Sequence, residues 1–386
     1  MKVLVLNYTH PEGYPPTFNA INNLSKHFDD VYVLSTDTLD TKWKYDNNVI
    51  LNLLNAEKDR FKAIKKSKWV KLNSYLNYLK TLYKIIKKNK PEVILIYDNV
   101  PFLFYYLVSK LMVFTKKPIV WYHNHDIFPL SSYKKYSINW WGAICEQKCL
   151  NMATIFSLPA NERKEYFPMN TFKGKYLFIP NYPSKYFHGK LSIEAKKIDN
   201  KINIIYPGSI CEKHGFEEVI SILNEKIEGK EIHLTLLGDI NDVYKDKLLT
   251  IAKQHDTIKN LHFQSRVSYF DVPDVMKTQH IGWAVNKPLD VTYATGGTAA
   301  NKIYEFLALG MPIILIDNEH YRQYLQGNNW AFFSDLTESS LIEQIQNIIK
   351  DYQILSNQAR KAFEDNFTFE TSFENAINLV KKEIKN

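Results

Sequence analysis

The stretch NKIYEFLALGMP, residues 301–312, is followed directly by the apolar run IILID, residues 313–317. Its apolar residues recur at the spacing of an amphipathic helix, and its Gly-x-Pro ending stops that helix. A helix that leads straight into a short, continuous apolar run is typical of a parallel sheet covered by helices on both faces. The stretch therefore predicts an α/β fold.

The same alternation of apolar runs and helical patterns extends over the whole chain. The apolar runs of the first half are VLVLN (3–7), VYVLST (31–36), VILIY (93–97) and PIVWYH (118–123). Those of the second half are NIIYPGS (203–209), IHLTLLGD (232–239), LHFQS (261–265), IGWAV (281–285) and PIILID (312–317). This pattern predicts two consecutive Rossmann-like, doubly wound parallel-sheet domains with a cleft between them.

Chain length agrees with two domains, because 386 residues exceed what one typical core supports. The segment 188–201 is polar, rich in lysine and without clear periodicity, so it is the predicted linker. We therefore expect a first domain over residues 1–187 and a second over residues 202–369. The C-terminal helix, at about residues 370–386, is expected to pack back on the first domain.

Composition indicates a reducing compartment. The three cysteines form no CxxC pair and leave an odd one over, which argues against a disulfide framework. The apolar core of the N-terminal segment MKVLVLNYTH is too short for a signal peptide or a membrane span. The expected location is the cytoplasm.

Residues 58–90 combine twelve Lys or Arg with one Asp, interleaved with aromatic and aliphatic residues. One interpretation is a solvated helix face. Another is an interfacial helix whose apolar side chains enter lipid while its lysines bind anionic headgroups, which would place the protein peripherally on a membrane. Nucleic acid is the third possible partner, but no nucleic-acid motif accompanies the stretch, so none is expected.

Ligands of doubly wound sheets bind beyond the carboxyl ends of the strands, where helix N-termini offer free N–H groups. The segment GGTAANKIYEF, residues 296–306, fits this rule. Gly296 and Gly297 let the backbone approach a ligand, while Thr298 and Asn301 are candidate caps or donors. The segment is a candidate phosphate site.

Glu305 lies about one turn into this helix, where its carboxylate could bind a vicinal diol such as a ribose. The alternative is a solvated pair between Lys302 and Glu305 at i,i+3, which would contribute a few tenths of a kcal/mol. Spacing alone leaves both interpretations open.

Several segments, taken in order, resemble the large retaining group 1 family of GT-B nucleotide-sugar glycosyltransferases of bacterial polysaccharide synthesis. The N-terminal half supplies three of them, WYHNHDIFP (121–129), CEQKCLNMATIFSLP (145–159) and FIPNYPS (178–184). The C-terminal half supplies YPGSICEKHG (206–215), LLGD (236–239) and the run Asn301, Lys302, Glu305, Ala308, Gly310 and Pro312. Each motif is weak alone, but the resemblance covers nearly the whole chain.

The resemblance implies a donor site in the second domain. Glu305 would bind the ribose of a nucleotide diphosphate sugar, and the backbone from Gly297 to Ala300 would bind the diphosphate, with Lys302 near it or in solvent. The loop around Gly208, with Lys213 and His214, would face the phosphates. The resemblance leaves UDP and GDP equally open and implies no cofactor and no metal.

Two departures from the family pattern concern this donor site. The family usually has Arg directly after the glycine, where this chain has Ser209, so one positive charge must come from Lys213, His214 or another group such as Arg266 or Lys287. The family also commonly has two glutamates separated by seven residues, of which the first touches the sugar. Eight positions before Glu305, at the position of that first glutamate, this chain has Gly297. The identity of the sugar therefore does not follow from the resemblance.

On the acceptor side, the resemblance places His125 against the donor sugar, and the neighbouring Asp126 could serve as a base in an inverting reaction. Gly13 and Thr17 lie in the first loop and would face the acceptor or the phosphates, although a plain turn explains them nearly as well. His123 and His125 suggest a metal pair, but no third ligand is spaced near them.

The leading hypothesis is a glycosyltransferase that moves a sugar from a nucleotide diphosphate sugar to a glycan or lipid-linked acceptor, with retention of the anomeric configuration as the expected outcome. The chief rival is a non-catalytic scaffold that has lost turnover, as Ser209 and Gly297 would allow. A sugar-nucleotide epimerase on the same fold is a further alternative. A dinucleotide-dependent enzyme is disfavoured, because no GxGxxG follows the first strand.

Overall fold

The computed structural model describes residues 1–36, 43–54, 67–114, 116–191 and 196–385. The chain forms two compact units, of which unit 1 comprises residues 1–181 and 369–386 and unit 2 comprises residues 182–368. No helix within the described ranges is both long enough and apolar enough to cross a membrane.

Unit 1 contains a parallel sheet whose described strands run in the order β3-β2-β1-β4-β5-β6-β7. The strands are β1 (Lys2–Leu6), β2 (Asp30–Thr36), β3 (Val49–Leu54), β4 (Val93–Tyr97), β5 (Ile119–His123), β6 (Ile155–Leu158) and β7 (Lys175–Phe178). The helices are α1 (Pro15–Leu24), α3 (Lys68–Asn89), α4 (Asn99–Ser109), α5 (Ile138–Cys149) and α14 (Phe369–Lys385). Short 3-10 turns are η1 (Pro11–Gly13), η2 (Leu130–Ser132), η3 (Leu150–Met152) and η4 (Asn161–Tyr166).

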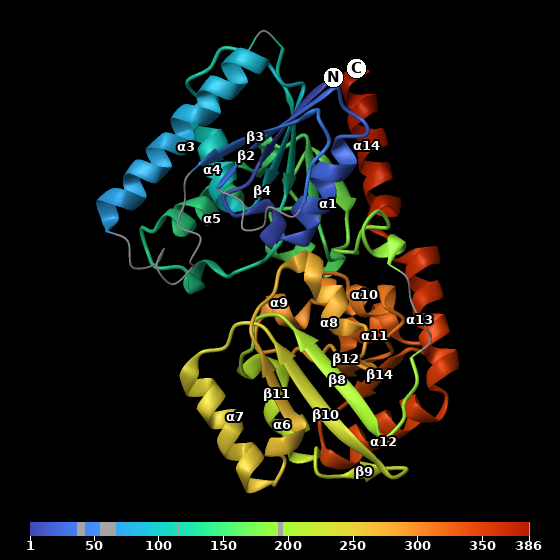
Figure 1. Cartoon of the computed structure of the whole chain (residues 1–386). Coiled ribbons are helices and arrows are strands. Elements are labelled where there is room, and N and C mark those ends of the chain that lie inside the picture. The colour runs from blue at the N-terminus through green and yellow to red at the C-terminus, as the bar shows by residue number, and fades with distance from the viewer. Residues whose placement is uncertain (37–42, 55–66, 115, 192–195, 386) are drawn as a thin grey trace. The chain divides into compact units, whose positions relative to one another are not determined.

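Helices cover both faces of this sheet (Figure 1). On one face, α1 and α14 bury aliphatic and aromatic side chains against β1, β4 and β5. Phe373 of α14 is 1% exposed and stacks on Trp121 of β5 with ring centroids 5.2 Å apart. Burying an aromatic side chain contributes about 1.5–3 kcal/mol, so the last helix is an integral part of the first unit.

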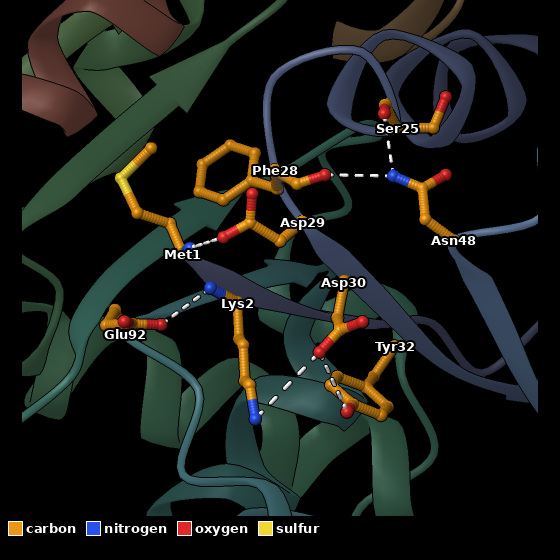
Figure 2. A network of polar contacts seen from close by, with 9 residues as sticks. All are labelled: Met1, Lys2, Ser25, Phe28, Asp29, Asp30, Tyr32, Asn48 and Glu92. Atoms are coloured by element: carbon orange, nitrogen blue, oxygen red, sulfur yellow. Dashed lines mark hydrogen bonds and ion pairs between the residues drawn. The ribbon is translucent and has the colours of Figure 1, made fainter.

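The amino ends of the strands are tied by polar contacts (Figure 2). The N-terminal amine pairs with Asp29, and the backbone N–H of Lys2 donates to Glu92 Oε2 at 2.6 Å. Asn48 donates to the carbonyl oxygens of Ser25 and Phe28 at 2.8 and 2.9 Å. These contacts fix the register at the edge opposite to the carboxyl ends, where ligands bind in such folds.

Unit 2 contains a second sheet, with the described strand order β11-β10-β8-β12-β13-β14 and with β9 antiparallel to β10. The strands are β8 (Lys201–Pro207), β9 (Lys226–Ile227), β10 (Lys230–Leu237), β11 (Leu261–Gln264), β12 (Ile281–Trp283), β13 (Ile313–Ile316) and β14 (Ala331–Ser334). The helices are α6 (Phe216–Ser221), α7 (Asp242–Gln254), α8 (Val272–Met276), α9 (Val291–Ala294), α10 (Asn301–Ala308), α11 (Glu319–Leu325), α12 (Glu338–Lys350) and α13 (Tyr352–Asn366). The 3-10 turns are η5 (His188–Lys190), η6 (Glu212–His214), η7 (Ile258–Asn260) and η8 (Tyr269–Asp271).

Strand order reverses at one point in each sheet. In unit 1, β1 lies between β2 and β4, and in unit 2, β8 lies between β10 and β12. Connections leave to opposite faces at such a switch point, which opens a crevice above the carboxyl ends of the central strands. Functional residues are therefore expected in the loops that follow β1, β4, β8 and β12.

The two-sheet parallel architecture that the sequence predicts is confirmed, and every strand quoted from the sequence is present within one or two residues. Some helix bounds differ. The run FLFYYLVSKLMVF, residues 102–114, predicts a helix, but α4 ends at Ser109, and the helix that opens at Asn301 ends at Ala308. The expected linker, residues 188–201, lies within unit 2, and its residues 192–195 lie outside the described part of the chain.

Candidate functional site

In unit 2, the loop after β8 lies against the end of β10. Gly208 has φ +140°, a conformation that L side chains rarely adopt, and its N–H donates to the carbonyl of Leu237 at 2.8 Å. A Cβ on Gly238 would lie 1.8 Å from the carbonyl oxygen of Gly208. The glycine of the LLGD motif is therefore required for the close approach of the two strand ends.

The glycines before α10 have a packing function. A Cβ on Gly296 would lie 2.4 Å from Tyr321 Oη, and one on Gly297 would lie 3.0 Å from a ring carbon of Tyr324. The hydroxyl of Tyr304 donates to the carbonyl of Gly297 at 2.6 Å. Close packing against α11 and this hydrogen bond hold the loop in place, which explains both glycines without a ligand.

Glu305 is partly buried on α10 and accepts a hydrogen bond from the Tyr269 hydroxyl, with 3.1 Å between Tyr269 Oη and Glu305 Oε1. Burial raises the pKa of Glu305, and the Tyr269 hydrogen bond and the nearby Lys302 oppose that rise. The Tyr269 side chain of η8 thus holds the carboxylate of Glu305 in place near the N-terminus of α10.

Lys302 points toward the loop after β8. Its Nζ donates to Tyr206 Oη at 3.0 Å and lies 4.4 Å from the centroid of the same ring. A Cβ on Gly208 would lie only 3.3 Å from Nζ. Burial lowers the pKa of Lys302 to about 8, against the opposing influence of Glu305. The structure therefore places Lys302 beside Gly208. This differs from the alternative in which Lys302 and Glu305 form a solvated pair.

His214 is a buried, neutral imidazole beneath that loop. Its Nδ1 lies 3.2 Å from the carbonyl oxygen of Val285, which can only accept, so Nδ1 carries the proton. Its Nε2 lies 2.7 Å from Tyr206 Oη and is left to accept. Burial, the main cause, and the nearby Lys302 lower the pKa of His214 to about 3. The side chain carries no positive charge at neutral pH.

The remaining candidate cations of unit 2 are paired with carboxylates. Lys213 Nζ lies 2.6 Å from Asp290 Oδ2 and 4.6 Å from the ring centroid of Tyr293. The other two ion pairs join Lys287 to Glu218 at 2.5 Å and Arg266 to Asp239 at 3.4 Å. Each of these charges is therefore already compensated within unit 2.

The other donor-side candidates lie around the same strand ends. Thr298 is 1% exposed in the loop before α10, and Asn301 is the first residue of that helix. The helix cap is Ala300, which makes no side-chain cap bond. Asn301 Oδ1 is buried without a hydrogen-bond partner among the described residues. Ser209 contributes its carbonyl oxygen, 3.1 Å from Tyr206 Oη.

In unit 1, His125 follows β5 and is 2% exposed. Its ring stacks on Tyr97 with centroids 4.6 Å apart and lies 4.2 Å from the ring of Tyr14. Nε2 lies 3.1 Å from Thr17 Oγ1, while Nδ1 has no partner among the described residues. Burial lowers the pKa of His125 well below its usual value, so the imidazole is neutral.

Asp126, the next residue, accepts a hydrogen bond from the Tyr14 hydroxyl at 2.6 Å. Gly13 and Thr17 therefore flank Tyr14, whose hydroxyl reaches Asp126. Gly13 itself is exposed. The structure thus brings His125, Asp126 and Thr17 together at the carboxyl edge of the first sheet.

Buried polar groups support the backbone of this segment. The carbonyl of His125 accepts from Arg163 Nη1 at 2.6 Å, and its N–H donates to Asp98 Oδ1 at 2.9 Å. Burial raises the pKa of Asp98 to about 8. Asn124 donates to Glu146 Oε1 at 2.8 Å, and burial raises the pKa of Glu146 to about 7.

Sequence reasoning did not single out four of these residues, namely Tyr14, Asp98, Tyr206 and Tyr269. Asp98 directly follows β4, so the rule of searching after strand ends would have found it. Tyr14 stands between Gly13 and Thr17, both of which were candidates. Tyr206 and Tyr269 carry no signal of their own, because a tyrosine within a strand or in a short turn is usually a packing residue.

Two parallel sheets of this kind, one in each unit, define a protein of the GT-B fold class. Residues 190–366 match the family described as "Glycosyl transferases group 1". The match covers nearly all of unit 2, and it confirms the resemblance drawn from the sequence motifs. Family and fold together support glycosyl transfer as the activity.

Solved structures agree in fold over the whole chain. Sucrose-phosphate synthase from Thermosynechococcus elongatus has 10% identity and a TM-score of 0.71, with 100% of this chain and 99% of that chain covered. HepE from Anabaena, solved with UDP and glucose, has 12% identity and a TM-score of 0.68, with 99% and 100% covered. WaaG, a glycosyltransferase involved in lipopolysaccharide biosynthesis, has 11% identity and a TM-score of 0.67, with 98% and 99% covered. No curated protein matches the sequence.

Proposed function

We propose that the protein transfers a sugar, in the expected case a hexose, from a nucleotide diphosphate sugar to a glycan or lipid-linked acceptor. The observation that carries the proposal is the placement of Glu305. Its carboxylate lies at the first turns of α10 beyond the carboxyl end of β12, and Tyr269 orients it. A carboxylate can accept two hydrogen bonds from a vicinal diol, so it suits the ribose of a nucleotide.

The diphosphate would bind between the loop at Gly208 and the start of α10. At the N-terminus of this helix, no side chain of the capping residue bonds to the backbone N–H groups of the first turn. Such free N–H groups favour the binding of an anion. HepE, a neighbour in fold, was solved with UDP-glucose, which supports UDP as the first nucleotide to test. Donors already in place around a diphosphate would stabilise the charge that develops as it leaves.

In unit 1, His125 is proposed to contact the donor sugar. Its buried Nδ1 is an unused hydrogen-bonding atom, and the rings of Tyr97 and Tyr14 fix the imidazole plane. Asp126 is the candidate base for an inverting outcome, but the group 1 family favours retention. NMR of the product's anomeric proton decides between the two outcomes. The reaction is expected to need no metal, and turnover in excess EDTA tests that expectation.

The donor proposal is tested by calorimetry with UDP, GDP and their sugars. The parent protein should bind one of these nucleotides, and Glu305→Ala should weaken that binding at least tenfold, as loss of charge-assisted hydrogen bonds predicts. Lys247→Met is a matched control, because Lys247 is a surface residue of the same unit. Equal binding by the Glu305→Ala variant and the parent protein would show that the site is misassigned.

For the acceptor side, we propose that the protein works at the cytoplasmic face of a membrane with anionic lipids. In α3, only the C-terminal half buries side chains, among them Tyr78 and Leu82. Trp69, Leu72 and Leu76 share one helix face by their spacing and are 79, 46 and 55% exposed. Residues 58–66 of the expected basic stretch lie outside the described part of the chain.

Charge supports an anionic surface as the occupant of this face. Lysines flank the apolar side chains along α3, and Lys68, Lys80, Lys84 and Lys87 are exposed. Each lysine near an anionic surface contributes about 1 kcal/mol, and the exposed tryptophan suits the headgroup region. A lipid-linked acceptor would then be held next to its enzyme. The similarity in fold to WaaG is in keeping with a surface polysaccharide as the product.

Vesicle flotation tests this surface. The parent protein should float with vesicles that contain phosphatidylglycerol and less with neutral vesicles, and a Trp69→Ser/Leu72→Ser double variant should float less with both. Val243→Ser is a matched control, because Val243 is an exposed apolar residue of unit 2. Equal flotation with the two lipid compositions, or no effect of the double variant, would remove the membrane proposal.

A further inference from the structure

The donor site proposed for unit 2 needs a positive charge to bind a diphosphate. A diphosphate needs a cation, yet the residue after Gly208 is Ser209, which has none. Lys213, Lys287 and Arg266 each lie within 4.0 Å of a carboxylate, and His214 is neutral with both ring nitrogens engaged. Each of the three cations thus has a carboxylate partner, and His214 is uncharged.

Lys302 differs from all of them. Among the described residues, no carboxylate lies within salt-bridge distance of its Nζ, which donates a hydrogen bond to the neutral hydroxyl of Tyr206. The ammonium lies beside Gly208 at the start of α10, whose capping residue Ala300 makes no side-chain bond. A partly buried cation without a counter-ion, next to uncapped helix N–H groups, is a built anion site.

The tyrosine hydroxyl is itself oriented. Tyr206 Oη has two neighbouring acceptors, His214 Nε2 at 2.7 Å and the carbonyl oxygen of Ser209 at 3.1 Å. Its single proton goes to one of them, and in either case its lone pairs face the ammonium of Lys302. The chain of contacts from the Val285 carbonyl through His214 and Tyr206 therefore holds Lys302 in its place.

We propose that Lys302, positioned by Tyr206 and His214, is the cation that binds the diphosphate of the donor in this chain. The inference rests on the proposed function and assigns the charge that Ser209 lacks to the opposite side of the loop, on α10. Tyr206 and His214 are positioning residues, because they act through Lys302 and not on the nucleotide.

This assignment links donor binding to proton uptake. The ionisable side chains on the elements around Lys302 are Tyr206, Cys211, His214, Tyr293, Glu305 and, on α13, Arg360. Burial lowers the pKa of Lys302 to about 8, and an arriving anion raises it again. At pH 8, binding should therefore take up as much as roughly half a proton. His214, with a pKa of about 3, contributes nothing in this range.

The experiment is calorimetry of UDP, and of GDP in a parallel series, at pH 7 and in two pH 8 buffers of different ionisation enthalpy. Lys302→Met should weaken UDP binding about tenfold or more at pH 7 and abolish proton uptake, while binding of uridine measured by NMR stays within about twofold. Lys302→Arg should keep most of the affinity without the uptake at pH 8, because arginine stays charged.

Tyr206→Phe keeps the lysine but removes the hydroxyl that accepts from it. The midpoint at which UDP affinity falls with rising pH should then shift to lower pH, an effect that loss of packing alone would not produce. Lys247→Met should behave as the parent protein does. If the parent binds UDP and Lys302→Met binds it equally well, this inference is overturned while the proposed function stands. A parent protein that binds neither nucleotide overturns both.

Discussion

Replacing Glu305 with glutamine should weaken nucleotide binding and stabilise the free protein at the same time. A hydrogen bond to a charged group contributes about 1.5–3 kcal/mol and a neutral one about 0.5–1.5 kcal/mol. Two ribose hydroxyls that lose a charged acceptor should thus lose about 2–3 kcal/mol together, or roughly 30- to 150-fold in affinity. Calorimetry with UDP and GDP measures the loss.

The stability change has the opposite sign. Burial raises the pKa of Glu305 in the folded protein, so the ionised carboxylate weakens the folded state increasingly as pH rises above its unfolded-state pKa. Glutamine has no charge to bury and can still accept from the Tyr269 hydroxyl, so the melting temperature of the ligand-free variant at pH 8 should equal or exceed that of the parent.

Both measurements are needed to refute the reasoning. A Glu305→Gln variant that melts lower without ligand would mean that Glu305 is a structural residue paired within unit 2. Unchanged affinity for both nucleotides would mean that the carboxylate does not face a ribose. Glu343→Gln is a suitable control, because Glu343 is an exposed residue of α12 that makes no hydrogen bond or ion pair within the described part of the chain.

Three further predictions concern the framework around the sites. Gly238→Ala should lower the free energy of unfolding of unit 2 by about 2 kcal/mol or more, as read by urea denaturation, because its Cβ would lie 1.8 Å from a carbonyl oxygen. Phe373→Ala should lower the free energy of unfolding of unit 1 by about 3–5 kcal/mol, which calorimetric melting would show as a lower melting temperature for the transition of that unit. Asp98→Asn should stabilise unit 1 most above pH 8 and least near pH 4, in a pH series of melting curves, because burial raises the pKa of Asp98 to about 8 and its carboxylate costs stability as pH rises toward that value.

The strands that the sequence predicts are those whose apolar runs are long and rich in Val, Ile and Leu, such as β4 and β10. Short strands were harder to foresee. β7 and β14 have four residues each and are only partly buried over most of their length, so their patterns do not differ from those of loops. Their pairing in the sheet, not local periodicity, determines their conformation.

The direction of Lys302 illustrates what helical spacing leaves open. Lys302 and Glu305 lie on one side of α10, and the spacing is equally compatible with a solvated pair. The structure settles their direction because Ile303, Phe306 and Leu307 are buried in the core of unit 2, which turns the polar side toward the loop at Gly208 and toward η8.

Long-range contacts tie part of the expected linker, residues 188–201, to unit 2. Its composition indicates a linker, but Arg360 of α13 donates to the carbonyl oxygens of His188 and Gly189 and also to Ala308 at the end of α10. One partly buried guanidinium thereby ties the start of the segment to the helix that carries Glu305. A partner 170 or so positions away cannot be recognised from local pattern.

The central claim is that unit 2 binds a nucleotide diphosphate sugar and that the protein transfers the sugar. The most direct test incubates the parent protein and Glu305→Ala with radiolabelled UDP-sugars or GDP-sugars and a membrane extract as acceptor, and follows both release of the nucleotide and label in the glycolipid fraction. We predict that the parent protein releases nucleotide in step with incorporation of label and that the variant does neither above background. Incorporation that is equal in both proteins, or absent with every nucleotide sugar while the folded parent binds none of them, would contradict the account.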